Sequence, residues 1–144
     1  NPTMDRSPEV YLVREKMQQT GVDFHIDVHG DEALPYNFVA GFEGAPSVTQ
    51  QQLDLLAAYK KTLCALSPDF QVEHGYPVDP PKSSDLKKCT DYVAETFGCV
   101  SMTLEMPFKD NANLPDDLFG WSPDRCRYLA HACLASLAQH LDDI

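Results

Sequence analysis

The sequence predicts an α/β fold, in which helices pack against a sheet. Two short segments, 24–28 and 99–106, have the apolar patterns of strands, because apolar residues alternate with polar ones in both. Longer segments repeat apolar residues at helical spacing between capping residues. The predicted order of helix, strand, helix, helix, strand, helix is typical of α/β proteins, although two strands are too few for a complete sheet.

The first three predicted elements lie before residue 47. Ser7 and Pro8 are residues that favour a helix start, and they predict a helix over about residues 7–20 that ends before Gly21. The alternating strand then ends at His29-Gly30. Residues 33–46 contain two prolines and two glycines, which predicts a packed loop with at most a short strand.

Three more helices and one strand are predicted for residues 47–144. Two of the helices are separated by an irregular, proline-rich segment at 75–81, and the strand ends at Pro107. The predicted helices run from Ser47 to about Leu66, from Ser83 or Ser84 to Phe97 before Gly98, and from Ser122 toward Leu141.

Length and charge exclude several classes of function. The 144 residues fit one domain, and 22 acidic against 11 basic residues give a net charge of −11. This charge opposes phosphate backbones and anionic membranes, so we expect neither a nucleic acid nor a membrane as a partner. No apolar run approaches the ~20 residues of a membrane span.

The cysteines and the first residue bear on the origin of the chain. Five cysteines without a Cys-x-x-Cys pair predict buried, reduced thiols in a cytoplasmic protein. The chain begins at Asn1 without an initiator methionine. We therefore expect it to be cut from a longer protein.

Two residues at predicted strand ends are the main candidates for chemistry. Ligands of α/β sheets gather beyond the carboxyl ends of strands, where His29 and Glu105 are predicted to lie. A neutral imidazole at His29 suits a metal ligand, although a histidine before glycine is also common as a structural residue. A buried carboxyl at Glu105 should have a raised pKa, which suits a general base, although a structural ion pair explains it equally well.

The polar residues near this pair are weaker candidates for a functional role. Asp27 and Asp31 are candidates to orient His29, whereas Glu32 is expected to be a solvated turn residue. His25 is expected to be a hydrogen-bonded structural histidine rather than a second ligand.

Four motifs together resemble a known family. They are Asn1-Pro-Thr with Ser7-Pro-Glu-Val10, Asp27-Val-His-Gly30, Pro35-Tyr-Asn-Phe38 and Leu104-Glu-Met-Pro-Phe108. In order and spacing they resemble the cytosolic-carboxypeptidase-like branch of the zinc metallocarboxypeptidases, in a bacterial form.

The resemblance implies an incomplete catalytic domain. It assigns the last of three zinc ligands to His29 and the general base and acid to Glu105. The first two ligands and the Asn-Arg pair that binds the substrate carboxylate would come before Asn1. Residues 1–144 would then be the C-terminal portion of one domain, part of an α/β/α sandwich with a mixed sheet. The N-terminal half of that domain is absent from these residues and would be their missing partner.

The implied reaction is zinc-dependent hydrolysis of the last peptide bond of a peptide or protein tail. Counting back from Glu105 places the floor of the side-chain pocket near Thr90, where Lys87 or Lys88 is a candidate to favour an acidic terminus. The alternative is that both lysines are solvated on the surface of a helix. The same counting places the substrate-closing tyrosine of the family near Ser83 rather than on Tyr76 or Tyr92. This tyrosine is therefore not assigned to a residue. Two alternatives remain: a non-catalytic half-domain or binding module, and a zinc deacylase of small acyl amino acids.

Overall fold

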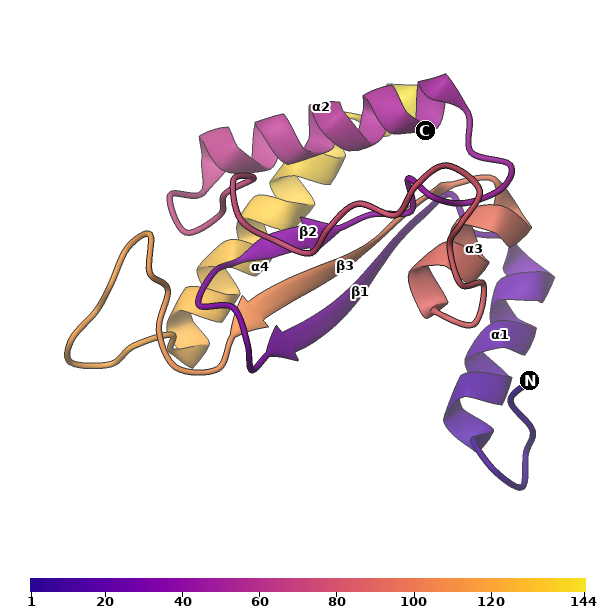
Figure 1. Cartoon of the computed structure of the whole chain (residues 1–144), viewed down its shortest axis with the longest axis horizontal. Coiled ribbons are helices and arrows are strands. Elements are labelled where there is room, and N and C mark those ends of the chain that lie inside the picture. Colours follow the sequence, from indigo (N-terminus) through magenta and orange to yellow (C-terminus); the bar gives the residue numbers. More distant parts are fainter.

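A computed structural model describes residues 1–144 and contains one three-stranded mixed sheet. Strand β1 (Phe24–Asp31) pairs in parallel with β3 (Val100–Pro107), and the short β2 (Phe38–Ala40) pairs antiparallel with β3 on its other side (Figure 1). The predicted α/β class is confirmed. Because β3 is central, β1 is a long edge strand with one unpaired side.

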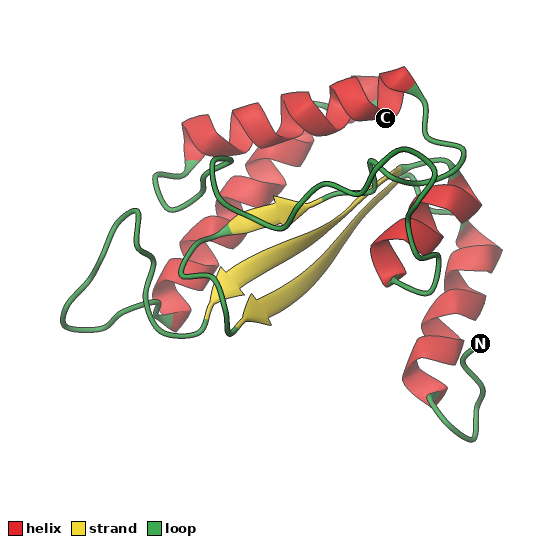
Figure 2. Ribbon diagram, viewed as in Figure 1, coloured by secondary structure: helices red, strands yellow, loops and turns green.

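Four α-helices and a short 3₁₀ helix accompany the sheet, and the first helix projects away from it (Figure 2). They are α1 (Pro8–Thr20), α2 (Gln50–Leu66), α3 (Cys89–Phe97), α4 (Pro123–Ala138) and the 3₁₀ turn Leu141–Asp143. None of these helices is long and apolar enough to cross a membrane.

One face of the sheet is apolar and carries the core. Met102 and Leu104 project from it and are buried against α2 and α4, because alternate residues of a strand share a face. The two helices also contact each other, since the Tyr59 hydroxyl donates to the Cys133 carbonyl at 3.3 Å and Ser136 Oγ donates to the Tyr59 carbonyl at 3.1 Å. This packing fixes the central strand against α2 and α4.

The opposite face of the sheet is polar. Residues 71–88 cross in front of it as an irregular segment and lead into α3 (Figure 1). The segment approaches the loop after β2 closely, because a Cβ at Gly44 would lie 2.6 Å from Asp79 Cβ. The parallel register places side by side His25 and Ser101, Asp27 and Thr103, and His29 and Glu105.

Two predicted helix starts are wrong. Helix α2 begins at Gln50 with Thr49 as its cap, because the Ser47 hydroxyl and amide bind Glu95 instead of capping the helix. Helix α3 begins at Cys89 rather than at Ser83 or Ser84. The residues between are irregular, and neither serine caps the helix: the Ser83 hydroxyl donates to the Pro80 carbonyl at 2.7 Å, and the Ser84 amide donates to the Gly44 carbonyl at 3.1 Å.

The cysteine prediction is also wrong in part. All five cysteines are free, and Cys99 and Cys133 are buried, but Cys89 is exposed. Its position at the start of α3 places it in the wall of the cavity described below rather than in the core.

Candidate active site

The two candidate residues meet at the carboxyl ends of neighbouring strands. His29 on β1 and Glu105 on β3 are register partners, and His29 Nδ1 lies 3.6 Å from Glu105 Oε1. Parallel pairing explains the meeting, because it brings both strand ends to one edge of the sheet. The structure therefore joins two residues that are 76 positions apart in the printed sequence.

His29 is held on its other side by Asp27. His29 Nε2 lies 3.1 Å from Asp27 Oδ2, on the same face of β1 two residues earlier. A carboxylate in this position fixes the ring orientation and leaves Nδ1 to face Glu105. The His29 side chain is 49% exposed, so a ligand can reach it.

Glu105 is buried, and its pKa is raised. Only 8% of its side chain is exposed, and burial is the main cause of the raised pKa. The charge of His29 opposes this shift, whereas the charges of Asp31, Asp27 and Glu32 add to it. A buried carboxyl of raised pKa beside an imidazole can accept and release a proton.

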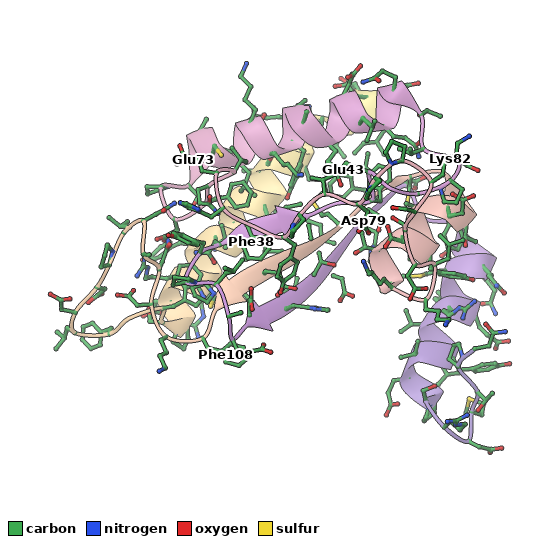
Figure 3. All side chains as sticks on the ribbon, in the orientation of Figure 1. Phe38, Glu43, Glu73, Asp79, Lys82 and Phe108 are labelled. Atoms are coloured by element: carbon green, nitrogen blue, oxygen red, sulfur yellow. The ribbon has the colours of Figure 1, made fainter.

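Both residues line a cavity of about 390 Å³ on the polar face of the sheet. The sheet forms its base, residues 76–79 and the start of α3 form one wall, and the loop after β2 forms another. Figure 3 shows Phe38 on β2 beneath the crossing segment, with Glu43 and Asp79 farther toward α3. A cavity of this size accommodates a side chain and part of a peptide backbone.

Tyr76 is a residue of the cavity that sequence reasoning left without a role. Its ring meets Phe38 edge-on with the ring centroids 5.0 Å apart. Burial, followed by the charge of Glu105 and the proximity of Asp31, raises the pKa of Tyr76 to about 12. The phenol is therefore neutral and able to donate a hydrogen bond into the cavity. Tyr92 instead lies on α3 beneath Arg14, with 3.9 Å from the guanidinium carbon to the ring centroid.

The three residues expected at the side-chain pocket are placed differently from one another. Thr90 and Lys88 line the cavity, whereas Lys87 does not. Thr90 is buried and its hydroxyl lies 2.7 Å from that of Thr103. The Lys88 ammonium is bound to Asp79 Oδ2 at 3.2 Å, and its side chain is 59% exposed.

The remaining acids and histidines do not complete a metal site within the chain. His25 Nδ1 lies 2.9 Å from Ser101 Oγ, the hydrogen-bonded position expected for it. Asp31 is buried and accepts from the Ala33 amide at 2.8 Å, and Glu32 is exposed. His29 and Glu32 have His-x-x-Glu spacing, but no three ligand-type side chains converge to hold a metal ion.

Asp91, in the cavity wall, should make the stability of the chain depend on pH. Burial raises its pKa more than the Ser84 hydroxyl and the Lys88 ammonium lower it, and the charges of Asp79 and Asp85 add to the rise. With a raised native pKa, the folded chain keeps a proton that the unfolded chain has released. The stabilisation is complete below the ordinary Asp pKa and is lost as the pH rises through the raised value.

We therefore expect Asp91→Asn to have a higher free energy of unfolding than the parent chain near neutral pH. Its free energy of unfolding should also fall less than that of the parent as the pH rises through the acidic range. Urea unfolding at a series of pH values measures both effects. Asp117→Asn, at an exposed loop position, is the matched control and should follow the parent. Identical curves for Asp91→Asn and the parent would contradict the expectation.

Comparisons with known proteins place this geometry in context. No protein-family model matches the chain. An uncharacterised protein from Zymomonas mobilis is 49% identical over 143 residues, which are 99% of this chain and 38% of that protein. The chain thus spans little more than a third of that relative.

Solved structures agree with this coverage. A metallo-carboxypeptidase from Burkholderia cenocepacia matches with a TM-score of 0.94 and 48% identity, over 99% of this chain and 38% of that one. A metallo-carboxypeptidase from Pseudomonas aeruginosa, solved with (2-guanidinoethylmercapto)succinic acid, matches with a TM-score of 0.97 and 38% identity over the same shares. The structural neighbours of this chain are therefore metallo-carboxypeptidases.

Proposed function

We propose that residues 1–144 form the C-terminal portion of the catalytic domain of a zinc metallocarboxypeptidase of the cytosolic-carboxypeptidase-like branch. The whole protein would remove the last residue of a peptide or protein tail in the cytoplasm. One observation carries the proposal: His29 and Glu105 face each other at 3.6 Å over a cavity, in a chain similar throughout its length to part of the metallo-carboxypeptidases.

The residues present fit one side of a zinc site. His29 offers an imidazole nitrogen toward the cavity while Asp27 holds the other nitrogen, which is the arrangement that metal-binding histidines use. When bound, zinc would supply a Lewis acid that polarises the scissile carbonyl. Catalytic zinc sites take three protein ligands, so two more would come from outside these residues.

Glu105 and Tyr76 supply the proton chemistry of this proposal. The Glu105 carboxylate would take a proton from the attacking water and pass it to the leaving amine. Its burial keeps competing water away from that proton. The neutral Tyr76 phenol would donate a hydrogen bond to the substrate beside it.

The missing partner would be the rest of the same domain. Strand β1 has eight residues and one unpaired side, and exposed edges of this length normally pair with another strand. An apolar hollow of about 460 Å³ lies beside it, between the sheet and α4. Additional strands at this edge would cover the hollow and stand next to His29, where the other ligands are needed.

The substrate class follows from the reaction and from one neighbour. The compound bound to the Pseudomonas aeruginosa protein carries carboxylates and a guanidino group, which are the groups of a peptide terminus with a basic side chain. We propose that this chain contributes to binding the same general class, a free peptide C-terminus.

Zinc binding and peptide hydrolysis test the proposal. The isolated chain is expected to bind zinc weakly and to show no peptidase activity, because it supplies His29 as one ligand of three. The protein extended by the coding sequence before Asn1 should hold one zinc per chain and cleave peptides from the C-terminus. Metal analysis after dialysis and a peptide assay measure these results.

Each alternative gives a different outcome. Tight stoichiometric zinc in the isolated chain, with His29 and two other residues as ligands, would contradict the incomplete site. Hydrolysis of N-acyl amino acids but not of peptides would favour a deacylase. Absence of both activities in the extended, zinc-loaded protein would favour a non-catalytic module.

A further inference from the structure

The Pro35-Tyr-Asn-Phe38 motif, which leads into β2, has no role in the proposed reaction. Its last three residues all contact the segment that crosses the polar face of the sheet. The Tyr36 ring stacks on the His74 ring, with 4.2 Å between the ring centroids and 18° between the ring planes. The Asn37 carbonyl accepts a hydrogen bond from the Gln71 side chain at 3.0 Å. The motif therefore supports the start of the crossing segment.

Gln71 fixes the course of the crossing segment above this motif. Its Oε1 atom accepts hydrogen bonds from the backbone amides of Glu73 and His74 at 2.8 and 2.6 Å. Its Nε2 atom also donates to the His74 carbonyl at 2.8 Å. These bonds close a turn, and the two residues that follow the turn, Gly75 and Tyr76, are the ones that reach Phe38.

Phe38 is an apolar side chain on the polar face of the sheet. It is the register partner of Glu105, and paired residues of neighbouring strands share a face. It is only 2% exposed but does not belong to the main core cluster, because the crossing segment covers it (Figure 3). A Cβ at Gly75 would lie 3.0 Å from Phe38 Cδ2, so the backbone approaches the ring closely. The Tyr76 ring meets the Phe38 ring at 82°, nearly perpendicular.

Phe38 thus connects two groups that the proposed reaction needs near each other. Strand pairing places Phe38 beside Glu105, and ring packing places Tyr76 on Phe38. Tyr76 is 48% exposed and belongs to an irregular segment, so neither burial nor a regular element holds its side chain. Edge-to-face aromatic pairs favour one mutual orientation, and this pair restricts where the Tyr76 hydroxyl can lie.

We infer that Phe38 is a positioning residue, which holds the Tyr76 phenol over the cavity beside Glu105. The inference rests on the proposed function, in which Tyr76 donates a hydrogen bond to the substrate. Phe38 is not among the residues that line the cavity, so it acts on the substrate only through Tyr76. Loss of the Phe38 ring would let the Tyr76 side chain leave the position from which it reaches the substrate.

Fluorine NMR tests the contact without requiring activity. Fluorotyrosine is incorporated into the protein extended before Asn1, and the Tyr76 resonance is assigned by its loss in Tyr76→Phe. We expect Phe38→Leu, which keeps an apolar side chain but removes the ring, to move the Tyr76 resonance toward that of free fluorotyrosine. Phe119→Leu makes the same change at a position that is 71% exposed, and this matched control should leave the Tyr76 resonance in place.

A double-mutant cycle tests the consequence for catalysis in the same protein loaded with zinc. Phe38→Leu should lower kcat/KM for a peptide by about three- to tenfold, the usual contribution of an aromatic pair. In the Tyr76→Phe background the same substitution should lower kcat/KM by less than about twofold, because the hydroxyl that Phe38 positions is already absent. A general loss of structure would instead lower kcat/KM equally in both backgrounds.

Equal falls in the two backgrounds, or a Tyr76 resonance that Phe38→Leu leaves in place, would overturn the inference. Gly75→Ala serves as the second variant if Phe38→Leu does not fold. Its backbone has no positive φ, and the added Cβ would push the segment away from the Phe38 ring. It should move the Tyr76 resonance in the same direction, and an unmoved resonance would overturn the inference. Failure to cleave any peptide would contradict the proposed function, while the NMR measurement would still decide whether Phe38 holds Tyr76.

Discussion

Glu105→Gln in the zinc-loaded protein extended before Asn1 is expected to lower kcat by a factor of about 10²–10⁴, the usual contribution of a general base. The amide has nearly the same size but cannot accept the proton of the attacking water. Zinc content should stay unchanged, because Glu105 is not proposed as a ligand. A peptide assay and metal analysis on the same preparation measure both quantities.

Two further variants separate catalysis from metal binding and from general charge effects. His29→Ala should lose zinc as well as activity, since it removes the proposed ligand. Glu9→Gln, at an exposed position of α1, makes the same chemical change away from the cavity and should keep full activity. Near-normal turnover in Glu105→Gln would mean that the role of Glu105 is structural.

Arg125→Ala is expected to lower the free energy of unfolding of the chain by about 3–5 kcal/mol, the range for breaking a buried ion pair from one side. Arg125 is only 13% exposed and binds the buried Asp69, and it also lies 3.2 Å from Asp110 Oδ1. Its guanidinium donates to the Leu114 carbonyl at 2.7 Å and to the Gly120 carbonyl at 3.2 Å. The variant therefore leaves the buried Asp69 carboxylate without a cation, with only the Asn111 amide as a donor, and releases the loop between β3 and α4.

Arg127→Ala provides the matched control two residues away. Arg127 pairs with Asp124 on the same helix, but both side chains are more than 70% exposed, at 71% and 77%. Such pairs contribute about 0–1 kcal/mol, so the control should be nearly as stable as the parent. Urea unfolding measures both variants, and equal losses in the two would contradict the structural role assigned to Arg125.

The local pattern of the sequence was sufficient for most of the elements. The alternation of apolar and polar residues at 24–28 and at 99–106 predicted β1 and β3, and capping residues predicted the starts of α1 and α4. Local signals failed where a distant partner took the capping group. Ser47 is a good cap by type, but Glu95, 48 residues away, binds it, and the helix begins beyond Thr49.

The sequence by itself also determined that His29 and Glu105 stand at strand ends, because strand periodicity and the residues that follow each strand are local properties. Only the tertiary structure decided that the two strands are parallel neighbours in register, which brings the side chains to 3.6 Å. It also decided that Asp91 is buried with its Oδ1 atom unpaired and that Lys88 is paired with Asp79. Burial and pairing depend on the packing of α3 and residues 71–88 against the sheet, and no local sequence pattern specifies contacts over such separations.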